Sequence, residues 1–249
     1  MDVAQLKADS TTRKPILRDV PYRISDFDEN ALEEGIRLKE KHGGKVTALT
    51  VGPPEAREIM RKALAMGADE GFVVADAAFT NADPLVTARG LVAALRKLRG
   101  WQLILCGEGS VDEYNAQVGP RVAEGLGIPQ LTYVSRLELR DDRVLGERSL
   151  EESVEVLEAP FPALLSVTME INQPRLPTLL QIMGASKKPL TVWTRQDVGL
   201  RDADLRPAVE TLDVVAPVAA RQKLRFEGEP QEVATKVAGL LVEGGWVKP

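Results

Sequence analysis

The stretch "WQLILCGEGSVDEYNAQVGPRVAEGLGI", residues 101–128, decides the fold, because it joins an apolar run, a loop and a helical pattern. The apolar run at 101–106 predicts a buried strand, and the pattern at 121–128 predicts a helix. In open α/β sheets, ligands bind where parallel strands end and the next helices begin. Residues 107–120 are therefore the candidate binding loop.

The same alternation of strand and helix runs upstream from this loop to residue 25. The expected helices are 25–44, 53–69 and 83–100, and the expected strands are 45–52 and 71–76. Ser25 and Asp28 resemble a capping box at the start of the first helix, and Gly43-Gly44 ends that helix. The alternation predicts an α/β fold: a mostly parallel sheet with helices on both faces.

The segments on either side do not continue the alternation of strand and helix. Residues 1–24 predict only a short hairpin, whereas an α/β unit of this type ordinarily opens with a strand. After Pro129, alternating residues around a turn at Asp141-Asp142 predict an antiparallel hairpin extension. The carboxylates of 150–158 alternate with valines, which favours a solvated strand face over an acid–base pair.

The last part of the chain has weak periodicity until a helical pattern at 230–241. A segment with so little core of its own is expected to pack on another protein. We therefore expect two parts: a nucleotide-binding α/β domain over 1–190, and a C-terminal arm over 191–249.

Composition narrows the function classes. The chain has 249 residues, a net charge of -5, one Cys and one His, and 44% hydrophobic residues. The negative charge argues against nucleic acid as a partner, and the single Cys and His argue against disulfides and Cys/His metal sites. Cys106 reads as an inert buried thiol, and His42 as a cation at a helix end. We expect a reducing cytoplasm, no membrane insertion, no metal and no catalytic residue.

The candidate loop is acidic and has no cation. Its carboxylates are Glu108, Asp112 and Glu113. Gly107 and Gly109 allow a close approach of the backbone, while Ser110 and Asn115 offer neutral hydrogen bonds. Main-chain amides can then hold a phosphate, leaving the carboxylates for ribose hydroxyls or helix capping. A tight turn with a helix cap and no ligand explains the same residues, so both alternatives stay open.

A second candidate is the apolar stretch "PTLLQIMGASKKP", residues 177–189. Leu179, Leu180, Ile182 and Met183 lie beside proline residues, which suits either an exposed apolar protrusion or ordinary core packing. The sequence leaves these two alternatives open.

Several stretches together resemble the β subunit of the electron transfer flavoproteins over residues 1 to about 200. The binding loop keeps a Gly-x-x-x-x-Asp-x-x-x-x-Gln-x-Gly skeleton as Gly107, Asp112, Gln117 and Gly119. The β-subunit signature is matched at Arg148, Glu151, Glu152, Glu155, Leu157, Pro162, Leu164 and Leu165, while Ser153 and Ser166 depart from it. The resemblance implies an adenine nucleotide α-hydrolase-like fold.

The resemblance also implies a heterodimer with an α subunit that holds a redox-active FAD. The β subunit would bind AMP or, in electron-bifurcating members, a second FAD. Residues 115–130 are closer to the bifurcating group and favour FAD. Such a subunit passes electrons between dehydrogenases and an acceptor oxidoreductase, a quinone pool or a ferredoxin-linked partner, with NADH as donor if it bifurcates.

Family contacts carry over to named positions of this chain. The expected cofactor-binding residues are Ser25, Asp26, Phe27, Asp28, Ala48, Val51, Gly52, Gly107, Gly109, Ser110, Val111, Asp112, Glu113, Asn115, Ala116, Gln117 and Val118. The expected partner-docking residues are Leu179, Leu180, Ile182 and Met183, with Leu179 in the anchor position.

Departures from the family pattern keep another function in view. The first family strand is missing, Tyr114 and Asn115 replace residues that are often Asp and small, and Ser149 stands where many relatives have Glu. The alternative is a stand-alone adenine-nucleotide sensor or ATP-using enzyme of the same fold.

Overall fold

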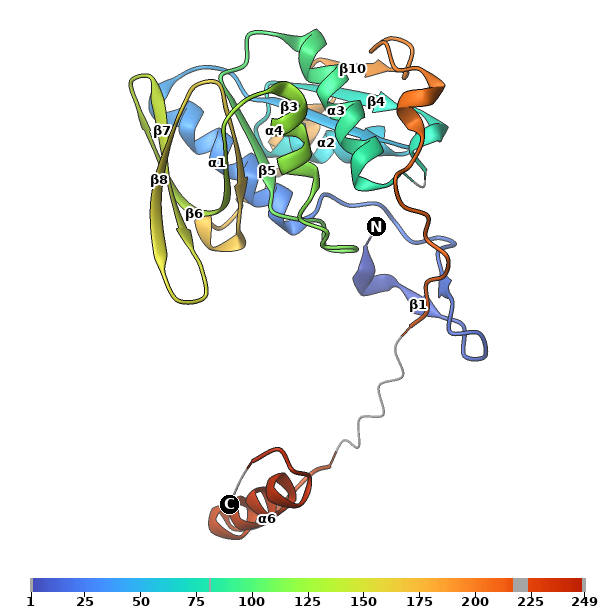
Figure 1. Cartoon of the computed structure of the whole chain (residues 1–249), viewed down its shortest axis with the longest axis vertical. Coiled ribbons are helices and arrows are strands. Elements are labelled where there is room, and N and C mark those ends of the chain that lie inside the picture. Colours follow the sequence, from blue (N-terminus) through green and yellow to red (C-terminus); the bar gives the residue numbers. More distant parts are fainter. Residues whose placement is uncertain (1, 81, 217–223, 248–249) are drawn as a thin grey trace.

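The computed structural model describes residues 2–80, 82–216 and 224–247, and helices and strands alternate through its α/β body (Figure 1). In chain order the alternating elements are α1 (Asp26–His42), β3 (Thr47–Gly52), α2 (Ala56–Met66), β4 (Glu70–Ala75), α3 (Pro84–Leu98), β5 (Leu103–Gly107) and α4 (Val118–Leu126). Each one lies where the sequence pattern predicts it, within a few residues at its ends. The predicted α/β fold class is confirmed.

Helices cover both faces of the strands. Because neighbouring residues of a strand point to opposite faces, they pack against different helices. In β5, Leu105 packs into the cluster that contains Ala31 of α1, whereas Ile104 packs with residues of α3 and α4. In β4, Val73 packs against α2 and Val74 against α3. The two buried layers explain why these strands read as continuous apolar runs.

The parallel strands form two hydrogen-bonded sheets instead of one continuous sheet. In the first, β10 (Leu190–Trp193), β4 and β3 lie in that order. In the second, β5, β9 (Ala163–Val167) and β6 (Gln130–Arg140) are parallel, and β7 (Arg143–Ser149) and β8 (Val154–Pro160) continue it antiparallel. In the described part of the chain, no strand bridges β3 and β5, so each ends its own sheet.

The hairpin extension β6–β7–β8 confirms the predicted turn, since the first two strands join at 141–142. The predicted solvated acidic face of β8 is only partly present. Glu155 lies on the inner side, where its carboxylate pairs with Arg148 at 2.6 Å. Val154 and Val156 instead share the exposed face, because a strand alternates its sides and the core face was set by Leu157 and Ala159.

Outside the alternating elements, the chain has a short hairpin at its start and a C-terminal segment of which only the first part is seen to pack on the core. Residues Lys7–Ala8 (β1) and Pro15–Ile16 (β2) form the short antiparallel hairpin expected near the start. Strand β10 lies across the expected boundary at residue 190, and Val198, Leu200 and Leu205 pack against the core after it. Helix α6 (Pro230–Glu243), all of whose residues are described, has no buried residue.

Candidate nucleotide-binding site and docking surface

The candidate loop lies between the end of β5 and the start of α4, as the sequence predicts. The main-chain N–H of Glu108 donates to Val167 O at 3.0 Å, and that of Tyr114 donates to Ser110 O at 3.0 Å. Tyr114 and Ala116 have φ angles of 47° and 53°, in the left-handed region that non-glycine residues rarely adopt. The loop is thus tightly folded on itself.

The first turn of α1 packs against the start of this loop. The Asp28 carboxylate accepts a hydrogen bond from the Gly107 N–H at 2.8 Å, and the Phe27 and Tyr114 rings lie 5.5 Å apart at 43°. A Cβ atom at Gly107 would lie 2.6 Å from Phe27 Cβ, so only glycine fits. The structure therefore brings together 27–28 and 107–114, two parts of the expected cofactor site.

The expected capping box at the start of α1 is wrong. Ser25 makes no side-chain cap; its hydroxyl instead donates to Gly109 O at 3.4 Å. The Asp28 carboxylate instead accepts a hydrogen bond from the Gly107 N–H, a donor 79 residues away in the chain. A carboxylate accepts from whichever donor packing brings to it, and packing places the Gly107 N–H at the end of β5 within hydrogen-bond distance of Asp28.

Burial shifts the pKa values of two neighbouring groups, Asp28 and Cys106, in the same direction. Desolvation raises the pKa of Asp28, against the hydrogen bond from Gly107, which lowers it. Burial also raises the pKa of the Cys106 thiol far above its ordinary value, and the Asp28 charge adds to this. Because the thiolate is the reactive form, a raised pKa lowers the reactivity of Cys106, which is consistent with the predicted inert thiol.

The acidic side chains of the loop are hydrogen-bonded within it. Glu108 accepts from the Tyr114 hydroxyl at 2.8 Å, Asp112 from the Glu113 N–H at 2.9 Å, and Glu113 from Asn115 at 2.7 Å. Desolvation raises the pKa of Glu108, although the bond from Tyr114 lowers it. No side chain caps α4 at Gln117, so the first N–H groups of that helix are left for solvent or an anion.

The predicted residues of β3 lie in a different environment. Ala48 packs in the clusters under α2, and Val51 packs with Phe79 and the α3 residues around it. Gly52 ends the strand and is buried. The side chains of Ala48 and Val51 belong to the core, and Gly52 has none. Main-chain atoms are therefore the groups of β3 that could reach a ligand.

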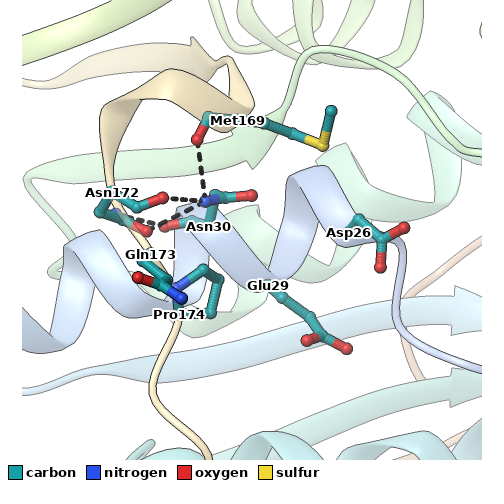
Figure 2. A pocket seen from close by; sticks show the side chains of 7 residues that line it. All are labelled: Asp26, Glu29, Asn30, Met169, Asn172, Gln173 and Pro174. Carbon is teal, nitrogen blue, oxygen red and sulfur yellow. Dashed lines mark hydrogen bonds between the residues drawn. The ribbon is translucent and has the colours of Figure 1, made fainter.

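A hollow of about 320 Å³ lies beside α1, on the side of the segment that follows β9 (Figure 2). It is lined by Asp26, Glu29, Asn30, Met169, Asn172, Gln173 and Pro174. Asn30 donates to Asn172 O at 2.7 Å, and Asn172 donates back to Asn30 O at 3.0 Å. Asp26 and Glu29 are paired with Arg23 and Lys62. The hydrogen bonds between Asn30 and Asn172 fasten this segment to α1.

The four predicted docking residues lie together on α5 (Leu179–Ala185) and are exposed. Leu179, Leu180, Ile182 and Met183 have exposed fractions of 75%, 82%, 51% and 65%. Core packing is therefore excluded, and the alternative of an apolar protrusion is correct. Ala185 is the buried residue of this helix and packs against the end of α2.

An ion-pair cluster before α5 was missed from the sequence. Glu33 of α1 is only 2% exposed and accepts from Arg175 Nε at 2.8 Å and from Arg37 Nε at 2.7 Å. Arg175 also donates to Glu40 at 2.5 Å. The available signal was the spacing of Glu33, Arg37 and Glu40 along one side of a helix, but nothing local pointed to Arg175.

Comparison with known proteins assigns the family. Residues 16–198 match the electron transfer flavoprotein domain. The chain belongs to the electron transfer flavoprotein β-subunit family. It is 42% identical to the electron transfer flavoprotein subunit beta of Thermoanaerobacterium thermosaccharolyticum over 244 residues, covering 96% of this chain and 94% of that protein.

Two further relatives cover most of both chains. The electron transfer flavoprotein subunit beta of Clostridium acetobutylicum is 39% identical over 204 residues, which is 82% of this chain and 78% of the relative. The caffeyl-CoA reductase-Etf complex subunit CarD of Acetobacterium woodii is 37% identical over 200 residues, 80% and 76% of the two chains. Among the described residues of this family member, no helix has the length and apolarity to cross a membrane.

Proposed function

We propose that this chain works in a heterodimer with an electron transfer flavoprotein α subunit and passes electrons between a dehydrogenase and an acceptor. The observation that carries the proposal is the family match across residues 16–198. The exposed apolar face of α5 supports a protein partner, because exposed patches of this kind mark interaction surfaces. The unburied α6 supports an arm that packs on the α subunit. For the compartment, the cytoplasm stays our prediction.

The nucleotide of this subunit belongs, in this proposal, at the loop between β5 and α4. The uncapped start of α4 suits an anion, since helix N–H groups and the helix dipole attract negative charge. The carboxylates of the loop are turned toward donors of the loop itself, so they do not have to face a phosphate. A Cβ at Gly109 would lie 2.9 Å from the Tyr114 ring, so a ligand above Gly109 requires that ring to move.

A second FAD is our preferred ligand and AMP the alternative. Residues 115–130, which are closer to the bifurcating group, favour FAD, and NADH would then be the electron donor. A bound flavin supplies the electron transfer, while this chain binds and orients it. AMP would instead stabilise the fold through linkage. The CarD relative, named for a caffeyl-CoA reductase complex, supports an oxidoreductase of CoA thioesters as the partner.

The deciding experiment is to co-purify the chain with its α subunit, denature the complex and count the released AMP and FAD. Two FAD per heterodimer would support the bifurcating function, and one FAD with one AMP the simple carrier. The alternative function, a sensor or ATP-using enzyme, predicts ATP binding or turnover by the chain without an α subunit. A colourless chain that binds no α subunit would contradict the proposal.

A further inference from the structure

The protruding helix α5 is short, yet the chain is anchored on both sides of it. On the downstream side, Ala185 is buried and Lys188 Nζ donates to the carbonyl oxygens of Leu64 and Ala68 at 2.8 and 2.7 Å. These contacts fasten the end of α5 to the end of α2. The apolar side chains of α5 therefore point away from a fixed base.

The upstream anchor is Arg175, three residues before the Thr178 cap of α5. Its guanidinium holds Glu33 through Nε at 2.8 Å and Nη2 at 3.1 Å, and its main-chain N–H donates to the same carboxylate at 3.2 Å. The remaining nitrogen reaches Glu40 at 2.5 Å. Several charge-assisted bonds on one planar group fix both its position and its orientation.

The segment between this anchor and α5 has little freedom of its own. Pro177 restricts the backbone, and Thr178 and Gln181 form a capping box that starts the helix. Upstream of Arg175, the mutual hydrogen bonds of Asn30 and Asn172 hold the chain to α1 (Figure 2). The orientation of α5 thus depends on the contacts of residues 172–175 with α1 as well as on the downstream contacts with α2.

We propose that Arg175 is a positioning residue that, through Glu33 and Glu40, holds the apolar side chains of α5 in one orientation for docking into an apolar pocket of the partner oxidoreductase. The inference rests on the proposed function, because it concerns the same docking surface. Its physical basis is preorganisation: an apolar surface that is already ordered loses less conformational entropy when it binds.

The first test measures the anchor without any partner. Hydrogen exchange of the co-purified heterodimer should show faster exchange at residues 176–186 in Arg175→Ala, with residues 107–118 unchanged. Arg175→Lys should restore part of the protection, because it keeps one charged bond. Arg143→Ala is the matched control, since Arg143 also pairs with two carboxylates but lies on the hairpin. Unchanged exchange at 176–186 would overturn the proposal.

The second test is a double-mutant cycle with a purified flavin-dependent acyl-CoA dehydrogenase as the probe. Arg175→Ala should raise the KM for the heterodimer about five- to tenfold with kcat nearly unchanged, as expected for lost preorganisation. In a Leu179→Ala background the same substitution should have a much smaller effect, because both act through one surface. Fully additive effects would overturn the proposal.

The cycle also separates this inference from the proposed function. If Leu179→Ala and Leu180→Ala leave the KM unchanged, α5 is not the docking surface and the proposed docking fails. If they raise the KM while Arg175→Ala does not, docking stands and only the anchoring role of Arg175 is wrong.

Discussion

Helix α1 supports both candidate sites, but it holds them by different forces. Its N-cap and first turn hold the binding loop through the hydrogen bonds Ser25–Gly109 and Asp28–Gly107 and one aromatic contact. Its middle and last turns hold the segment before α5 through charged groups, with Glu33 and Glu40 both bound to Arg175. A single helix thus carries a lightly held loop and a firmly held protrusion.

This difference in bonding suggests a different role for each region. Charge-assisted bonds in a multidentate group are about twice as strong as neutral ones, so we expect the α5 segment to be ordered before any partner arrives. The loop, with Tyr114 and Ala116 in left-handed conformations, has acidic side chains that accept hydrogen bonds within the loop, and we expect it to adjust to a ligand more readily than α5. Three substitutions and one pH dependence test this contrast, from the largest expected effect to the smallest.

Gly107→Ala should have the largest effect, because its Cβ would collide with the backbone and Cβ of Phe27. We expect a loss of about 2 to 3 kcal/mol in the free energy of unfolding and loss of the nucleotide. Urea unfolding and a count of released nucleotide measure both. Gly184→Ala in α5, where a Cβ meets open space, is the control and should not destabilise. Nucleotide retained in Gly107→Ala would show that the loop is not the binding site.

Glu33→Gln should cost about 1 to 2 kcal/mol, because it removes the charge from several hydrogen bonds while keeping the shape. The loss should appear in urea unfolding at neutral pH and should leave nucleotide content unchanged. Glu158→Gln is a suitable control, since its carboxylate binds Arg143 on an exposed strand. Equal effects of the two substitutions would contradict the special strength of the α5 anchor.

The Glu33 anchor should also depend on pH. Burial alone raises the pKa of Glu33, but the hydrogen bonds from Arg175 and Arg37 outweigh it and hold the pKa below its ordinary value of 4.5. Its stabilisation is therefore complete above about pH 4.5 and is lost as the pH falls through the lowered pKa. The difference in unfolding free energy between wild type and Glu33→Gln should shrink over that acid range, and a constant difference would refute the coupling.

Asp28→Asn should have the smallest effect on the fold. Because desolvation raises the pKa of Asp28, its ionised form costs stability, and its contribution falls as the pH rises through that pKa. Asparagine keeps an oxygen for the Gly107 N–H without the charge, so unfolding free energy should change by less than about 0.5 kcal/mol or rise. Asp28→Ala, which leaves that N–H without the bond, should lose about 1 kcal/mol. A larger loss in Asp28→Asn would mean that the charge itself stabilises the loop.

The sequence by itself determined the local elements and their order. The helices of residues 26–126, the strands between them and the turn at 141–142 follow from apolar periodicity and from turn residues, which act over a few neighbours. The candidate binding loop was located from its place between a strand and a helix. The exposure of Leu179 was left open by the sequence, because periodicity shows an apolar face but not what covers that face.

Only the tertiary structure decided the pairs that join distant parts of the chain. The Asp28 carboxylate accepts a hydrogen bond from the Gly107 N–H, 79 residues away in the chain, and Glu33 pairs with Arg175, 142 residues away. Strands β3 and β5 likewise are edge strands of two separate sheets, and the Val154 side chain lies on the exposed face of β8. Local pattern cannot fix such outcomes, since each polar group bonds to whichever partner the packed core brings within about 3 Å.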